Sequence, residues 1–157
     1  LAQSIRTNLI LANMKGFSSG LFLNEKKIED AGQKNIASLR IKTPSIDEIV
    51  GQLSGGNQQK VVIGKWVNTD ADIFIFDEPT RGIDVGAKVE VYNVMNSLVK
   101  QGKCVIMVSS EMPEILGMSD RVVVMRGGKV MAEVDRDSEH FNQEDLMKAA
   151  WGGKLDD

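Results

Sequence analysis

The feature that most constrains the fold is an unbroken apolar run, Ile73-Phe74-Ile75-Phe76, that ends at Asp77-Glu78-Pro79. Such a run, closed by a turn signal, predicts a strand that is buried on both faces. A helical pattern follows over Val85–Lys100, and Cys104–Val108 repeats the strand pattern. A strand, a helix and a strand joined by short links form a βαβ unit. The sequence therefore predicts an α/β fold with a parallel sheet.

Helical and hairpin patterns surround this unit. We expect helices or short helical turns over residues 5–12, 25–39, 46–50, 54–67, 112–117 and 142–151, with Asn24 as an N-cap. In the helix over Val85–Lys100 we expect one buried stripe, made by Val85, Val89, Tyr92 and Leu98. Arg126-Gly127-Gly128 separates two strand patterns and predicts a tight hairpin. The chain thus divides into a helical segment, residues 1–52, and an α/β layer, residues 53–157.

Composition excludes some classes of function. The chain has 157 residues, 42% of them hydrophobic and 26% charged, which suits one globular domain. Its net charge of −3 argues against a nucleic-acid binder with a broad basic surface. We find no membrane-spanning run and no signal-peptide pattern, and the chain begins at Leu1 rather than Met, which predicts a fragment. Cys104 is expected to be a buried strand residue, and His140 a solvated one.

Two adjacent glycines open a predicted helix in "LSGGNQQK", residues 53–60. An N-cap explains Ser54, with Asn57 three residues later, but each glycine costs about 1 kcal/mol relative to alanine within a helix. Bare backbone amides at a helix start, beside a hydroxyl, can instead bind an anion such as phosphate. Both interpretations remain open from the local pattern alone.

Two acids end the first predicted strand. Asp77 and Glu78 could mark an ordinary strand exit. They also lie at the carboxyl end of a parallel strand, where open α/β sheets bind ligands. There, one carboxylate can hold Mg²⁺ and the next can orient or deprotonate a water molecule. The phosphate-binding pattern G-x-x-x-x-G-K-[S/T] is absent, because none of the four Gly-Lys pairs precedes Ser or Thr.

Three motifs together carry a family resemblance. "LSGGNQQK", then "IFIFDEPT" about 20 residues later, then "RGIDVGA", resemble an ABC-transporter ATP-binding domain in order and spacing. "DEPTRGIDVGAKVEVYNVM" and "VSSEMPEILGMSDRVVVMRGGKV" are similar to the second ATP-binding half of ribose- and galactose-type monosaccharide importers. The resemblance implies a partial P-loop NTPase (RecA-like) fold that lacks the P-loop strand, with residues 1–52 as the helical subdomain and 53–157 as the C-terminal part of the ATPase core.

The resemblance also implies roles for single residues. Ser54, Gly55 and Gly56 match the signature that contacts the γ-phosphate of ATP held by the opposite domain, and Asn57 replaces the more common Gln. Asp77 matches the Mg²⁺-side Walker B acid and Glu78 the catalytic glutamate.

Two further positions complete the implied site. Asp84 matches the D-loop aspartate, and it can cap the following helix at the same time. Ser110 stands where the family has its switch histidine. Serine cannot shuttle a proton near neutral pH, so the site of Glu78 is expected to be slow or non-hydrolytic.

The implied protein is the ATPase subunit of an importer that energises monosaccharide uptake, with ATP and Mg²⁺ as ligands. Its implied partners are the first ATP-binding domain, the membrane permease subunits and, indirectly, an external sugar-binding protein, with no nucleic acid. It would lie peripherally at the cytoplasmic face of the membrane. The isolated chain is expected to be inactive. The alternatives are a non-hydrolytic interaction or regulatory module, and a soluble ABC ATPase of DNA repair or translation, which "RGIDVGA" and "SSEMPE" argue against.

Overall fold

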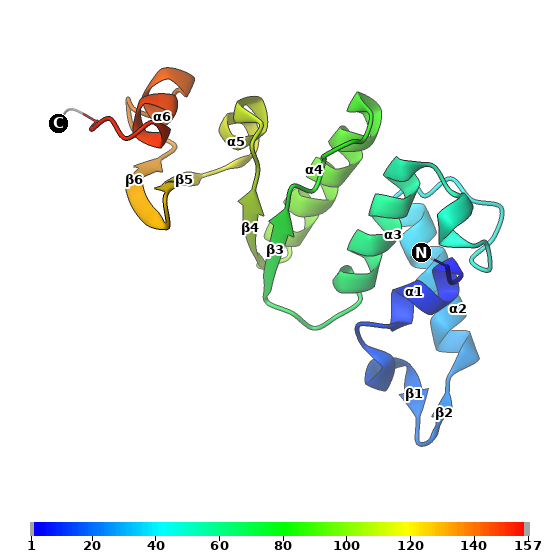
Figure 1. Cartoon of the computed structure of the whole chain (residues 1–157). Coiled ribbons are helices and arrows are strands. Elements are labelled where there is room, and N and C mark those ends of the chain that lie inside the picture. Colours follow the sequence, from blue (N-terminus) through cyan, green and yellow to red (C-terminus); the bar gives the residue numbers. More distant parts are fainter. Residues whose placement is uncertain (1, 156–157) are drawn as a thin grey trace. The chain divides into compact units, whose positions relative to one another are not determined.

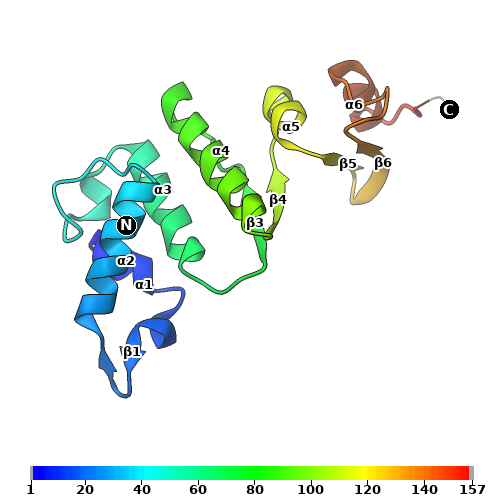
Figure 2. The same cartoon turned by 180° about the vertical axis from the view of Figure 1, so that it is seen from behind.

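The computed structural model describes residues 2–155, which form two compact units, one ending at Ile106 and the other beginning at Met107 (Figures 1 and 2). The first unit combines a helical part with a strand–helix–strand part. The second unit is a hairpin packed against short helices. No helix within residues 2–155 is long and apolar enough to cross a membrane.

The helical part of the first unit packs three helices around one core. These are α1 (Ile5–Ile10), α2 (Glu25–Ser38) and α3 (Gly55–Val67). The buried residues that they and their links share are Ile5, Leu9, Leu39, Ile41, Val50 and Val61. Asn24 caps α2 by accepting a bond from the Lys27 amide, as predicted. Between α1 and α2 lie a 3-10 turn, Met14–Phe17, and a small hairpin of β1 (Ser18–Ser19) and β2 (Phe22–Leu23), which the sequence did not indicate.

The predicted short helix over residues 46–50 is wrong. The backbone there bonds across to the start of α1 instead, because the Ile5 amide donates to the Glu48 carbonyl and the Arg6 amide donates to the Ile46 carbonyl. These carbonyls are therefore committed to another segment. A 3-10 turn forms only afterwards, over Val50–Gln52.

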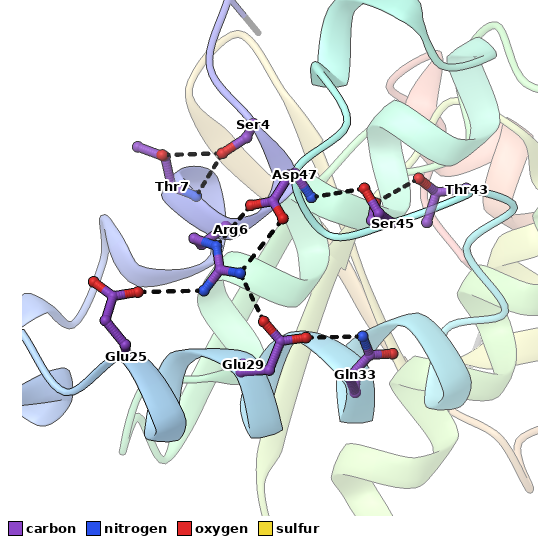
Figure 3. Close-up of polar contacts among 9 residues, drawn as sticks. All are labelled: Ser4, Arg6, Thr7, Glu25, Glu29, Gln33, Thr43, Ser45 and Asp47. Atoms are coloured by element: carbon purple, nitrogen blue, oxygen red, sulfur yellow. Dashed lines mark hydrogen bonds and ion pairs between the residues drawn. The ribbon is translucent and has the colours of Figure 1, made fainter.

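Arg6 joins α1 to α2 and to this segment through three carboxylates (Figure 3). Its guanidinium donates to Asp47 at 2.7 Å and to Glu29 at 2.6 Å, and its Nη1 lies 3.4 Å from Glu25. The hydrogen bond from Arg6 is the main cause that lowers the pKa of Asp47. The pKa of Glu29 is lowered first by the hydrogen bond from Gln33 and then by the one from Arg6.

The strand–helix–strand part confirms the predicted α/β fold. It consists of β3 (Ile73–Asp77), α4 (Val85–Lys100) and β4 (Cys104–Val108). The strands β3 and β4 form one sheet. The Cys104 amide donates to the Asp72 carbonyl at 2.8 Å, so the two strands start at the same end of the sheet and run in parallel.

Burial in this sheet differs from the prediction. Phe74 is buried, but Ile73 and Ile75 are 60% and 69% exposed, and Cys104 is exposed as well. The prediction of burial on both faces is wrong because, among residues 2–155, this sheet has only two strands. The predicted stripe of α4 is wrong for Val85 and Val89, which are exposed, and correct for Leu98, which is buried. The buried residues of α4 are Ala87, Val91, Met95 and Leu98.

The second unit is built around an antiparallel hairpin, as predicted. β5 (Arg121–Arg126) pairs with β6 (Lys129–Asp135) through a turn in which Gly127 and Gly128 both have positive φ. The helices are α5 (Met112–Met118) and α6 (Gln143–Ala150). The core of this unit is formed by Val122, Val124, Val134, Leu146 and Ala149.

Candidate functional site

Ser54 is the N-cap residue of α3 by position but not by bonding. Its side chain makes no capping hydrogen bond to the helix backbone. Instead, Ser54 Oγ accepts a bond from Asn57 Nδ2 at 2.9 Å. The N-cap interpretation therefore fails for the side chain. The first amides of α3 therefore lack a serine cap, and the helix start is exposed at Ser54 and Gly55 but buried at Gly56 and Asn57.

The two glycines of the motif have different structural reasons. A Cβ on Gly56 would lie 2.9 Å from the Cβ of Ala87, so close packing of α3 on α4 requires glycine there. A Cβ on Gly55 would meet no atom within 4 Å. Packing therefore explains Gly56 but not Gly55. Gly55 is the position that leaves open space beside the helix amides, where a ligand could approach the backbone.

Buried polar side chains fix the start of α3 to its neighbours. Asn57, which is 9% exposed, accepts a bond from the Lys42 amide at 3.0 Å while it donates to Ser54. Lys60, which is 4% exposed, donates to the Arg40 carbonyl at 3.0 Å and forms an ion pair with Glu90 of α4. The Asn57 side chain thus orients the Ser54 hydroxyl from within the protein. The sequence interpretation missed Lys60, although its place in the signature, three residues after Asn57, was a usable signal.

Asp84 is placed beside the start of α3. Its Oδ1 accepts a bond from the Ala87 amide at 3.0 Å, which confirms the predicted cap of α4. Its Oδ2 lies 3.8 Å from the point where a Cβ of Gly56 would stand. The structure therefore brings the signature segment and the Asp84 carboxylate together, although about 30 residues separate them in the sequence.

Asp77 and Glu78 lie at the carboxyl end of β3. Asp77 is exposed and is the last residue of the strand. Glu78 is half-buried and has a φ of 46°, a left-handed conformation that costs a non-glycine residue about 1–3 kcal/mol. No group of three His, Cys, Asp or Glu side chains within residues 2–155 could hold a metal ion. Asp77 alone suits Mg²⁺ only if phosphate and water oxygens supply the other ligands.

Ser110 belongs to the second unit and is exposed in the loop after β4. The loop is held by the preceding residue, because Ser109 Oγ bonds to the buried Glu114 carboxylate at 2.9 Å and accepts from the Glu111 amide. His140 lies elsewhere in this unit. Its Nδ1 is 2.9 Å from Asp145 Oδ2, and this contact is the main cause that lowers the pKa of Asp145. The expectation of a merely solvated histidine is therefore wrong.

Comparison with protein families gives a match to the ABC transporter family over residues 3–81. Three curated relatives are similar over nearly the whole chain. A ribose/galactose/methyl galactoside import ATP-binding protein of Rhizobium etli is 52% identical over 98% of this chain. A xylose import ATP-binding protein of Thermoanaerobacter pseudethanolicus is 52% identical over 96%. A ribose import ATP-binding protein of Oceanobacillus iheyensis is 50% identical over 96%. The chain spans 29%, 29% and 30% of the length of these proteins, respectively.

Solved structures share the fold. An inward-facing metal-chelate type ABC transporter superposes with a TM-score of 0.79 at 13% identity, over 96% of this chain and 59% of the other. An ATP-binding cassette in its ADP conformation gives a TM-score of 0.71 at 22% identity, over 96% and 60%. At these identities the likeness concerns the fold alone.

Proposed function

The chain belongs to the ABC transporter family, and from this premise we propose that it is part of the ATP-hydrolysing subunit of an importer that energises monosaccharide uptake. The observation that carries the proposal is the identity of 50–52% over at least 96% of the chain to import ATP-binding proteins named for ribose, galactose or xylose. Which of these sugars is carried depends on partner proteins.

The proposed role of the α3 start is to close over ATP that another domain holds. Ser54 and Gly55 are exposed, the Ser54 side chain does not cap the helix, and a Cβ on Gly55 would meet no atom within 4 Å, which leaves room for a phosphate. The helix dipole and the amides favour the negative charge of a γ-phosphate. Asn57 positions the Ser54 hydroxyl, and Gly56 keeps α3 in contact with α4. Asp84, beside Gly56, would face the same partner domain.

We propose that the carboxyl end of β3 contributes to a second ATP site, the one that this domain itself helps to form. Asp77 would hold Mg²⁺ together with phosphate oxygens, and Glu78 would orient the attacking water. Mg²⁺ neutralises charge on the phosphates when bound. Ser110, at the switch position, cannot accept or donate a proton as histidine does near neutral pH. We therefore assign this second site slow or no hydrolysis, and assign hydrolysis to the site that Ser54 covers.

The partners that follow are the first ATP-binding domain of the same transporter, membrane permease subunits and, indirectly, an external sugar-binding protein. The subunit would act peripherally at the cytoplasmic face of the membrane. Residues 1–52 would serve as the helical subdomain and residues 53–157 as the C-terminal part of the ATPase core. A second candidate is a regulatory module that docks without turning over ATP, which the serine at position 110 favours.

The test is a chimera in which this chain replaces the matching segment of the Oceanobacillus iheyensis relative. We expect the chimera to support ATP-dependent ribose uptake and Ser54→Arg to reduce uptake at least about 100-fold, because the arginine side chain blocks closure on the phosphate. Ser38→Arg, an equal change at the exposed end of α2, should keep normal uptake. Normal uptake with Ser54→Arg would refute the proposed role of α3. A chimera that assembles with the permease but neither hydrolyses ATP nor takes up ribose would favour the regulatory module.

A further inference from the structure

The hairpin of β1 and β2 carries an exposed apolar tip. Ser18 pairs with Leu23 and Ser19 with Phe22, and Gly20 turns the chain with a φ of 63°. The side chains at the tip are unusually open to solvent, since Leu21 is 99% and Phe22 79% exposed. In both views of the first unit the hairpin projects away from α1 and α2 (Figures 1 and 2). Leu11, Met14 and Leu23, in and next to the hairpin, are also 52%, 50% and 40% exposed.

The base of the hairpin is firmly built. Phe17 is buried with Ile10 and Ile28 in a small core of its own. The Asn24 amide donates to the Phe17 carbonyl at 2.8 Å, and Ser18 Oγ donates to the Met14 carbonyl at 2.8 Å. A separate buried apolar cluster thus anchors a hairpin whose two large apolar tip residues are exposed to solvent. Packing within this unit does not account for large apolar side chains at positions 21 and 22, and exposed apolar patches mark interaction surfaces.

The charges around the tip are basic. Residues 11–27 contain Lys15, Lys26 and Lys27 against the single acid Glu25, a net charge of +2 in a chain whose net charge is −3. Glu25 is engaged by Arg6. All three lysines are exposed, and Lys27 Nζ donates to the Gly16 carbonyl at the base of the hairpin. Of the acids that follow in α2, Glu29 is paired with Arg6 as well. An exposed apolar tip whose flanking segments carry exposed lysines is complementary to a surface that is anionic at its boundary and apolar just beneath it.

We propose that this hairpin surface, residues 11–27, binds the interface of an anionic lipid bilayer. Leu21 and Phe22 enter the boundary between headgroups and acyl chains, while the lysines contact the anionic headgroups. A lipid surface fits better than a protein because the projecting hairpin has strands of only two residues each, whereas a stable protein interface needs at least about 1,000 Å² of buried area (Figures 1 and 2). The proposal does not depend on nucleotide or on sugar transport.

The test is flotation of the purified chain with vesicles of phosphatidylcholine, alone or with about 30% phosphatidylglycerol. We expect nucleotide-independent binding to the anionic vesicles only. Lys15→Gln with Lys26→Gln should lower the partition coefficient about 25-fold, since each lysine near an anionic surface is worth about fivefold (about 1 kcal/mol). Leu21→Ser with Phe22→Ser should lower it at least tenfold. Ile75→Ser, at a 69% exposed apolar residue outside the hairpin, should leave it unchanged.

A second measurement keeps the test independent of variant folding. A fluorophore on Leu21→Cys, in a Cys104→Ser background, should brighten on anionic vesicles and be quenched by lipids labelled high in the acyl chain. Absence of binding to anionic vesicles, equal binding to neutral ones, or binding that the tip substitutions do not change would overturn the proposal. Crosslinking of the tip to a membrane protein in vesicles without anionic lipid would overturn it in favour of a protein partner.

Discussion

Gly55 and Gly56 are adjacent in one motif but differ in their surroundings, since only Gly56 packs against another helix. We expect Gly56→Ala to lower the free energy of unfolding by about 1–3 kcal/mol, because its new Cβ would collide with Ala87 at 2.9 Å. Gly55→Ala should leave it unchanged or raise it by up to about 1 kcal/mol, because alanine is the better helix former and meets no atom there. Urea denaturation of the two variants compares them directly. Equal destabilisation would mean that α3 does not pack on α4 as described.

Lys60 is buried and forms an ion pair with the partly exposed Glu90, so substitutions of the two residues should differ in cost. Glu90→Gln removes the negative charge that balances the buried ammonium of Lys60 and leaves it only neutral acceptors such as the Arg40 carbonyl, so we expect a loss of about 1–3 kcal/mol. Lys60→Met should cost less, because the Glu90 side chain is 25% exposed and can turn to water. A double-mutant cycle by urea unfolding measures the coupling. A larger loss for Lys60→Met than for Glu90→Gln would contradict this order.

At the residue scale, contacts between residues close in sequence could be predicted, and contacts with remote residues could not. The Asp84 cap depends on an amide three residues away, and it is present as expected. The reason for Gly56 depends on Ala87, and the buried setting of Asn57 depends on Lys42, which are contacts that only the folded chain creates. The motif could therefore be recognised from sequence, while the contacts that bury Gly56 and Asn57 could not.

At the scale of elements, the ends of helices and strands were predictable and their buried faces were not. α4 and β4 have the predicted bounds, because a capping aspartate and apolar runs mark them within the local sequence. Val85 and Val89 are exposed because the neighbour α3 contacts Ala87 instead. The hairpin of β1 and β2 was missed because Ser-Ser-Gly is typical of a loop. Which face of an element is buried depends on packing partners that are remote in sequence, and hydrophobic periodicity carries no information about those partners.

The Arg6 cluster, which holds α1, α2 and residues 45–48 together, should make stability depend on pH (Figure 3). The folded pKa values of Asp47 and Glu29 lie below their ordinary values of 3.8 and 4.5. The unfolded chain therefore binds more protons in this range, and stability present above about pH 4.5 is lost as pH falls through the lowered values. We expect Arg6→Met to have a lower free energy of unfolding than wild type at pH 7. Between pH 4.5 and pH 3, its free energy of unfolding should fall less than that of wild type.

The measurement is urea unfolding from pH 3 to pH 7, followed by Trp66 fluorescence in a Trp151→Phe background so that the first unit alone reports. Glu29 should keep part of its lowered pKa in Arg6→Met, because Gln33 still donates to it at 3.0 Å. Lys34→Met removes an exposed positive charge from α2 and should keep the wild-type pH dependence. If the free energy of unfolding changed with pH equally in wild type and Arg6→Met, the Arg6 cluster would not be the source of the pH dependence.

At the scale of the whole molecule, the chain exposes an apolar strand surface that suits self-association. Ile73, Ile75 and Ile106 are 60%, 69% and 47% exposed, and a groove of about 350 Å³ beside β3 is lined by apolar side chains that include Trp66. Both β3 and β4 present an unpaired edge within the part of the chain that the structure describes. Exposed apolar strands with open edges pair with further strands, and a second copy of the chain offers the same surface.

We therefore expect the purified chain to increase in mean mass with concentration in light scattering at tens of micromolar. Ile75→Lys should shift this association to at least tenfold higher concentration, because a charge on an edge strand opposes strand addition. Leu21→Lys, at the 99% exposed tip of the hairpin, is the matched control and should leave the association unchanged if the strand surface causes it. A monodisperse monomer would show that neither surface associates. If only Leu21→Lys weakened the association, the associating surface would be the hairpin rather than the sheet.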